Sequence, residues 1–142
     1  MPEPCARIAF IGGGFISFEF AHFAARLGSS SGEVHILEAA DQPLGPFDKD
    51  MVEQLIKASE DDGIHVHTSI SISGVTQKDS GYTIDFASGP SLEVDLVVNG
   101  AGRAPNIDQL QLENAGVTAS KKGISVDSSM RTSVPAVFAV GD

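Results

Sequence analysis

Three consecutive glycines, Gly12 to Gly14, separate an apolar run from a stretch rich in alanine and phenylalanine. This order predicts a strand, a tight turn and a helix whose N-terminus points at the turn. Gly12 would permit the sharp turn, and Gly14 would let the backbone approach a pyrophosphate closely. Gly13, between them, is assigned to the same cofactor-binding turn. The N–H groups and dipole of the helix would stabilise the anion. The segment therefore predicts a dinucleotide-binding βαβ unit.

The glycine pattern departs from G-x-G-x-x-G at one position. Ser17 stands where the third glycine would set how closely the helix and the strand pack. Serine is small enough to fit there, with a slightly looser contact. The alternative interpretation of the motif alone is a glycine-rich loop that holds no ligand.

A carboxylate further along the chain supports the dinucleotide interpretation. Glu38 ends the short apolar segment 34–38 and follows Gly14 by 38 − 14 = 24 residues, near the ~20 expected for an acidic residue that binds ribose. A carboxylate accepts hydrogen bonds from ribose hydroxyls and repels a 2′-phosphate. Residues 39–42 supply no Lys or Arg to reverse that preference. We therefore predict NADH over NADPH, the alternative being a solvated glutamate at a strand end.

Length and composition exclude several classes of protein. The net charge of −10 over 142 residues argues against nucleic-acid binding, which needs a basic face. No apolar run approaches the ~18 residues of a membrane span. The first residues lack the basic region and apolar core of a signal peptide, so a cytoplasmic location is expected. The single cysteine, Cys5, excludes an intramolecular disulfide and a cysteine-based metal cluster.

The hydrophobic periodicity predicts strands alternating with helices in the first half of the chain. Strands are expected at 7–11, 34–38 and 64–68, and helices at 14–27 and 49–62. Asp48 is the predicted N-cap of the second helix. This βαβαβ order is half of a doubly wound fold.

The period changes after residue 70. Short alternating segments at 70–76, 82–86 and 92–94 are separated by polar and glycine-containing turns, which predicts an antiparallel meander. The meander replaces the crossover helix expected before the next parallel strand, 96–98. The predicted fold class is therefore α/β: a Rossmann-like, doubly wound parallel sheet with an antiparallel three-stranded β-meander crossover.

Histidines and phenylalanines outside the glycine motif have simpler interpretations. His65 and His67 alternate along a strand and face one side of it. Without a third ligand at suitable spacing, they are predicted to be surface histidines and not a metal site. Phe18, Phe20 and Phe23 are expected in the core or in packing between domains.

Several ordered motifs together resemble a known family over essentially the whole chain. They are Gly12–Glu19, Glu38, Gly102–Asn106, Leu112–Val117 and Thr132–Asp142. The chain resembles the NAD(P)-binding domain of the pyridine nucleotide–disulfide oxidoreductases, such as glutathione reductase and dihydrolipoamide dehydrogenase. The stretch Phe15–Ala21 looks most like the glutathione-reductase-like branch.

The resemblance implies a role for each matching residue. Phe15 matches the aromatic residue, usually tyrosine, that covers the nicotinamide pocket, and Ile16 follows it in the cofactor-contacting stretch. Glu19 matches the glutamate near the nicotinamide and the flavin, so Phe15 and Glu19 are the catalytic candidates.

Two further segments match cofactor-binding positions of the family. Residues 100–103 (Gly100, Ala101, Gly102 and Arg103) match the loop that closes over the dinucleotide. Gly141 and Asp142 match the Gly-Asp pair that hydrogen-bonds the ribityl chain of FAD.

The departures from the family are as informative as the matches. The sequence matches neither the family's opening FAD-binding domain with its redox-active cysteine pair nor its C-terminal dimerisation domain, so the resemblance implies the central domain of a longer enzyme. The resemblance implies an NAD(P)-binding domain at 1–128, the start of a returning FAD-binding segment at 129–142, and a parent enzyme that is a homodimer. The fragment alone is expected to be inactive. The alternatives are a domain of an NADH oxidase or ferredoxin-reductase-like flavoenzyme, or a non-catalytic dinucleotide-binding module.

Overall fold

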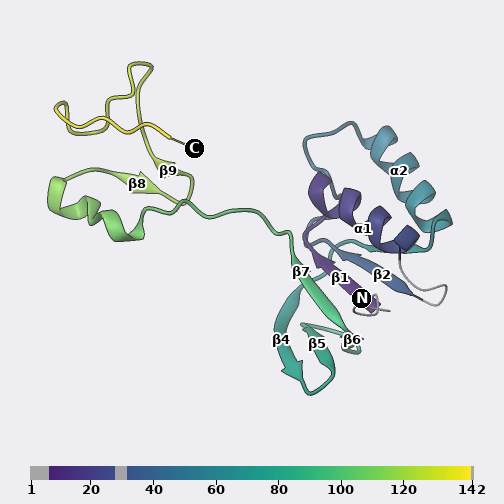
Figure 1. The fold of residues 1–142 in the computed structure, drawn as a ribbon. Coiled ribbons are helices and arrows are strands. Elements are labelled where there is room, and N and C mark those ends of the chain that lie inside the picture. Colours follow the sequence, from purple (N-terminus) through teal and green to yellow (C-terminus); the bar gives the residue numbers. More distant parts are fainter. Residues whose placement is uncertain (1–6, 28–31, 142) are drawn as a thin grey trace. The chain divides into compact units, whose positions relative to one another are not determined.

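The computed structural model describes residues 7–27 and 32–141 (Figure 1). The chain forms two compact units, residues 1–102 and 103–142, which are described separately. The predicted domain boundary after residue 128 stays a prediction.

The first unit contains a parallel sheet of four strands in the order β3-β2-β1-β7. Its strands are β1 (Arg7–Ile11), β2 (Glu33–Leu37), β3 (Ile64–His67) and β7 (Leu96–Asn99). Helices α1 (Phe15–Leu27) and α2 (Lys49–Asp61) connect the first three strands. Asp48 caps α2 as predicted, because its carboxylate accepts the N–H groups of Asp50 and Met51.

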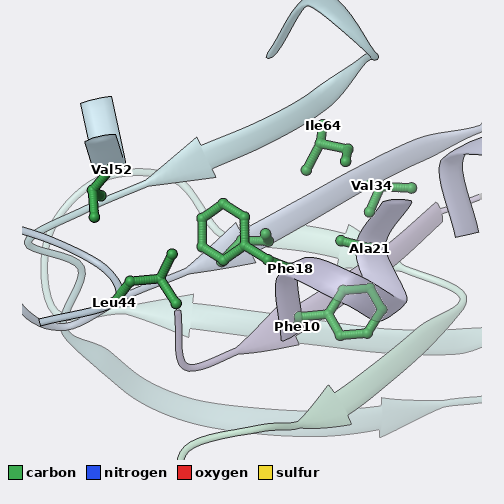
Figure 2. Close-up of a cluster of buried hydrophobic side chains, with 8 residues drawn as sticks. Phe10, Phe18, Ala21, Val34, Leu44, Val52 and Ile64 are labelled. Carbon is green, nitrogen blue, oxygen red and sulfur yellow. The ribbon is translucent and has the colours of Figure 1, made fainter. Parts of the chain in front are cut away.

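Side chains that alternate along each strand divide the sheet into two faces. One face packs against the helices, and Figure 2 shows the resulting core, in which Phe10 and Val34 lie among Phe18 and Ala21 of α1 and Val52 of α2. Phe18 is thus a core residue, as one of the two interpretations had it.

The other face packs against the meander. Its strands are β4 (Ile72–Lys78), β5 (Gly81–Phe86) and β6 (Leu92–Val94), paired antiparallel in the order β4-β5-β6. Ala9 and Leu37 of the parallel sheet form a second core with Ile84 and Val94 of the meander. The predicted α/β fold with a meander crossover is confirmed.

The second unit has little regular structure. It contains two 3₁₀ turns, Asp108–Leu110 and Leu112–Ala115, and a hairpin of β8 (Ala119–Ser120) and β9 (Gly123–Ile124). An isolated antiparallel bridge joins Arg131 to Phe138.

Candidate dinucleotide-binding site

A crevice of about 600 Å³ opens at the carboxyl ends of the parallel strands. Its walls come from Ile11–Gly14, Leu37–Ala39, Ile70–Ile72 and Gly100–Gly102. In open parallel sheets, ligands bind at this edge because the loops after neighbouring strands diverge there. The crevice lies entirely within the first unit.

Gly12 shapes the turn by its backbone conformation and by its lack of a side chain. Its φ is +96°, a left-handed conformation that glycine adopts without steric cost. A β-carbon on Gly12 would lie 2.7 Å from the carbonyl oxygen of Gly100 and from the α-carbon of Ala101. The turn after β1 therefore approaches the loop after β7 as closely as backbone permits.

Gly14 differs from Gly12 because it faces open space. Apart from its two neighbours in sequence, no described residue comes within 4 Å of the place where its β-carbon would stand, so packing does not require glycine at this position. Gly14 immediately precedes α1, whose first turn carries no acidic side chain that could bind the helix N-terminus. The open side of Gly14 and the N–H groups of this turn suit the approach of a pyrophosphate. The open space at Gly14 beside a helix N-terminus is therefore the feature of the crevice that fits a dinucleotide.

Glu38 anchors the opposite wall of the crevice to the glycine turn. One carboxylate oxygen accepts the N–H of Gly13 at 2.6 Å, and the other accepts the N–H of Ala40 at 2.8 Å. An ionised carboxylate has about four lone-pair sites, so acceptor capacity remains for ribose hydroxyls. The backbone next to Glu38 carries the exposed residues Ala39 and Ala40, which add no positive charge.

The loop after β7 completes the crevice with backbone atoms. The N–H of Gly100 binds the carbonyl oxygen of Ile11 at 2.8 Å, and the N–H of Ala101 binds the side chain of Asn99 at 3.1 Å. Gly100, Ala101 and Gly102 all line the site.

Six sequence-predicted residues stand apart from this group, and the first four are Arg103, Gly141, Asp142 and Glu19. Arg103 and Gly141 belong to the second unit. Arg103 is exposed, and Gly141 has a φ of +135°. Asp142 lies outside the described residues. Glu19 borders a separate hollow on α1 with His22, Phe23 and Arg26.

Phe15 and Ile16 are not among the residues that line the crevice. They belong to a row of exposed apolar side chains on α1, called here the α1 stripe, that also includes Phe20, Phe23 and Leu27. These five side chains are 55–77% exposed. Glu19 is exposed on the same helix. Solvent-facing helix positions are normally polar, so the α1 stripe has the character of a contact surface.

Sequence reasoning missed Ile70–Ile72 as a wall of the crevice and Asn99 as a support of its loop. The signal available was position: Asn99 is the last residue of β7, and Ile70 lies three residues after the end of β3, so both stand at the carboxyl edge of the sheet where the loops diverge. Within the described ranges, no helix is long and apolar enough to cross a membrane, and no group of three or more metal-ligating side chains could hold an ion.

Comparison with known proteins connects this chain to one family. Residues 1–142 match the sequence profile of the pyridine nucleotide-disulphide oxidoreductases. The dihydrolipoyl dehydrogenase of Bacillus subtilis (strain 168) is 40% identical over 145 residues, which cover 100% of this chain and 31% of the relative. The trypanothione reductase of Trypanosoma congolense is 35% identical over 144 residues, covering 100% and 29%.

Solved structures agree. The copper(II) complex of RclA, an HOCl-induced flavoprotein disulfide reductase from Escherichia coli, has a TM-score of 0.84 and 27% identity, covering 100% of this chain and 32% of that one. A ferredoxin reductase from Rhodopseudomonas palustris has a TM-score of 0.81 and 28% identity, covering 97% and 33%. The chain spans about a third of the length of these relatives, and it belongs to the pyridine nucleotide-disulphide oxidoreductase family of oxidoreductases.

Proposed function

We propose that the crevice binds NADH and presents its nicotinamide to the FAD of a disulfide reductase of the glutathione-reductase-like type. The observation that carries the proposal is the open space at Gly14, which lies beside a helix N-terminus in the same crevice as the carboxylate of Glu38. When bound, NADH supplies a hydride. The chain itself binds and orients the nucleotide.

Each wall of the crevice has a separate task in this proposal. The first turn of α1 and Gly12–Gly14 would hold the pyrophosphate through backbone N–H groups. Glu38 would accept hydrogen bonds from the ribose hydroxyls, and the loop Gly100–Arg103 would close over the nucleotide. Phe15 would cover the nicotinamide, with Ile16 and Glu19 beside it, at the start of the α1 stripe.

The preference for NADH rests on the charge of Glu38. A 2′-phosphate beside this carboxylate would be repelled, and each ~1.4 kcal/mol of repulsion is a tenfold loss of affinity. One structural neighbour (TM-score 0.80) is an engineered water-forming NADPH oxidase bound to NADPH, whose substitutions include aspartate to alanine and alanine to arginine. Those changes remove a negative charge and add a positive one. This chain instead keeps a carboxylate, Glu38, followed by the uncharged Ala39.

Family membership supports an extension of this proposal to the rest of the parent enzyme. We infer an FAD site to which Gly141 and Asp142 contribute, a returning FAD-binding segment from residue 129, and a homodimeric parent. A second candidate is a flavin NADH oxidase or ferredoxin-reductase-like enzyme. The structural neighbours of those two classes favour it, since they match this chain nearly as well as the disulfide reductase does.

Substitution of Gly14 by alanine tests the proposed function. The added methyl meets no atom of the other described residues, so the variant should fold normally, but the methyl would stand where the pyrophosphate approaches. NADH titrated by calorimetry should bind Gly14→Ala at least about tenfold more weakly, a loss of ~1.4 kcal/mol. Gly45→Ala is the matched control, because Gly45 also has open space around it and lies outside the crevice. Equal NADH affinity in wild type and Gly14→Ala would overturn the proposal.

A further inference from the structure

Three histidines meet on the face of the parallel sheet that the helices do not cover. His35 of β2 lies opposite His65 of β3 in register, and His67 is two residues further along β3. The ring centroid of His35 lies 5.0 Å from that of His65 and 5.4 Å from that of His67, and His35 stacks on both rings. The sequence predicted His65 and His67 as surface residues, but His67 is half-buried and packs against the buried ring of His35.

Two of these rings share a hydrogen bond. The Nδ1 atom of His35 lies 3.2 Å from the Nε2 atom of His67. One of these nitrogens must carry the proton and the other must offer its lone pair. The bond therefore survives when the two rings carry no added proton or one, and it breaks when both are protonated. The geometry of the pair therefore makes this hydrogen bond depend on whether a second proton binds.

The surroundings oppose protonation. Burial, followed by the charges of His65 and His67, lowers the pKa of His35, and burial followed by His65 lowers the pKa of His67. Glu33 is the one carboxylate that acts on His35 in the opposite direction, with 3.7 Å between Glu33 Oε2 and His35 Nε2. Arg7, opposite Glu33 in register on β1, is ion-paired with Asp95 at 2.9 Å.

The backbone beside this pair leads directly to the crevice. The carbonyl oxygen of His67 accepts the N–H of Glu38 at 2.8 Å, and the carbonyl oxygen of Glu38 accepts the N–H of Ile70 at 2.9 Å. Glu38 and Ile70 both line the crevice. Any loosening of β3 from β2 at His67 therefore moves the residue to which ribose binding is assigned.

We propose that the His35–His67 pair is a proton-operated control of the dinucleotide crevice: a second proton breaks the pair, loosens β3 beside Glu38 and weakens dinucleotide binding. This inference rests on the proposed function, since it assumes that the crevice is the binding site. Linkage sets the scale, because a single proton excluded from the bound state raises Kd by at most about tenfold per pH unit below the pKa.

The experiment measures the Kd for NAD⁺, which tolerates acid, by calorimetry between pH 8 and pH 5.5. We expect the wild-type Kd to rise by about three- to tenfold across this range, because one excluded proton gives at most about tenfold per pH unit and the pKa values of both rings are lowered. In His67→Gln, an amide that hydrogen-bonds but does not titrate replaces the ring, so the rise should fall below about threefold, with affinity at pH 8 unchanged. His65→Gln is the matched control from the same strand, outside the hydrogen bond. It should keep the rise in Kd, displaced to higher pH because the charge of His65 no longer lowers the pKa of His35 and His67.

Either of two results would overturn the inference: a wild-type Kd that does not change with pH, or a His67→Gln variant that keeps the full dependence. Circular dichroism at each pH verifies that every variant stays folded. Absence of NAD⁺ binding at pH 8 would instead refute the proposed function. In that case, titration of the imidazole nitrogens by NMR still tests the pair, and ordinary, independent titration of His35 and His67 would overturn it.

Discussion

The hydroxyl oxygen of Ser17 lies so close to the α-carbon of Gly100 that a β-carbon on Gly100 would collide with it. Helix α1 can therefore pack against the end of β7 only because one residue of this pair has no side chain. Ser17 occupies the position of the third glycine of the usual motif, and Gly100 supplies the space that such a glycine would have left. The serine is 2% exposed, and its hydroxyl has no hydrogen-bond partner among the residues that the structure describes.

Gly100→Ala should lower the free energy of unfolding by about 1–3 kcal/mol, the usual range for an overpacked core. Urea unfolding followed by circular dichroism measures the loss. The double variant Ser17→Ala/Gly100→Ala should recover at least half of it, because removal of the hydroxyl relieves the collision. Strictly additive effects of the two substitutions would contradict this relationship.

Ser17→Ala alone should leave stability unchanged or raise it by up to about 1 kcal/mol. A buried hydroxyl without a partner contributes a desolvation cost and no hydrogen bond. The same urea measurement tests this, and a loss above about 1 kcal/mol would mean that the hydroxyl has a bound partner in solution.

The sequence predicts the parts of the site that depend on local chemistry. Gly14 and Glu38 could be assigned from residue type and spacing, and Asp48 from its place before a helix. The compensation between Ser17 and Gly100 could not, because it depends on contact between segments more than 80 residues apart. The meeting of His35 with His67 likewise needs the register between β2 and β3, which periodicity alone does not give.

Asp48→Ala should destabilise the chain by about 1 kcal/mol, since the carboxylate accepts two N–H groups at the start of α2. Thermal melting measures the effect. Asp48→Asn is the matched control, because asparagine also caps helices well, and it should retain most of the stability. An equal loss in both variants would show that charge and not capping is responsible.

Acid should destabilise the fold through the histidine pair. The pKa values of His35 and His67 are lowered in the folded state, mainly by burial. The unfolded chain therefore binds more protons once the pH falls below about 6.5. The unfolding free energy should be constant above this pH and should decrease below it. Urea titrations at pH 7.5 and pH 5.5 measure the difference, which should be smaller in His67→Gln than in wild type.

The α1 stripe should promote self-association of the isolated chain. Phe20 and Phe23 are both more than half exposed, and their rings contact each other edge to face at 6.2 Å. Phe20→Ser/Phe23→Ser should lower the apparent mass seen by sedimentation at high concentration and leave NADH affinity unchanged, because neither side chain lines the crevice. An unchanged mass distribution would mean that the stripe does not bind other copies of the chain.

Charge reversal beside the ribose should reverse the choice of cofactor. Glu38→Ala removes the carboxylate, and Ala39→Arg adds a cation at an exposed crevice position. The ratio of Kd for NADPH to Kd for NADH should fall by about 100-fold or more, which corresponds to ~2.8 kcal/mol. Glu38 also binds the N–H of Gly13, so the single variant Glu38→Ala should weaken both cofactors through the turn. The added arginine should restore only NADPH, because a guanidinium pairs with a phosphate but gains little from a ribose hydroxyl. An unchanged ratio in the double variant would remove Glu38 from any role in cofactor choice.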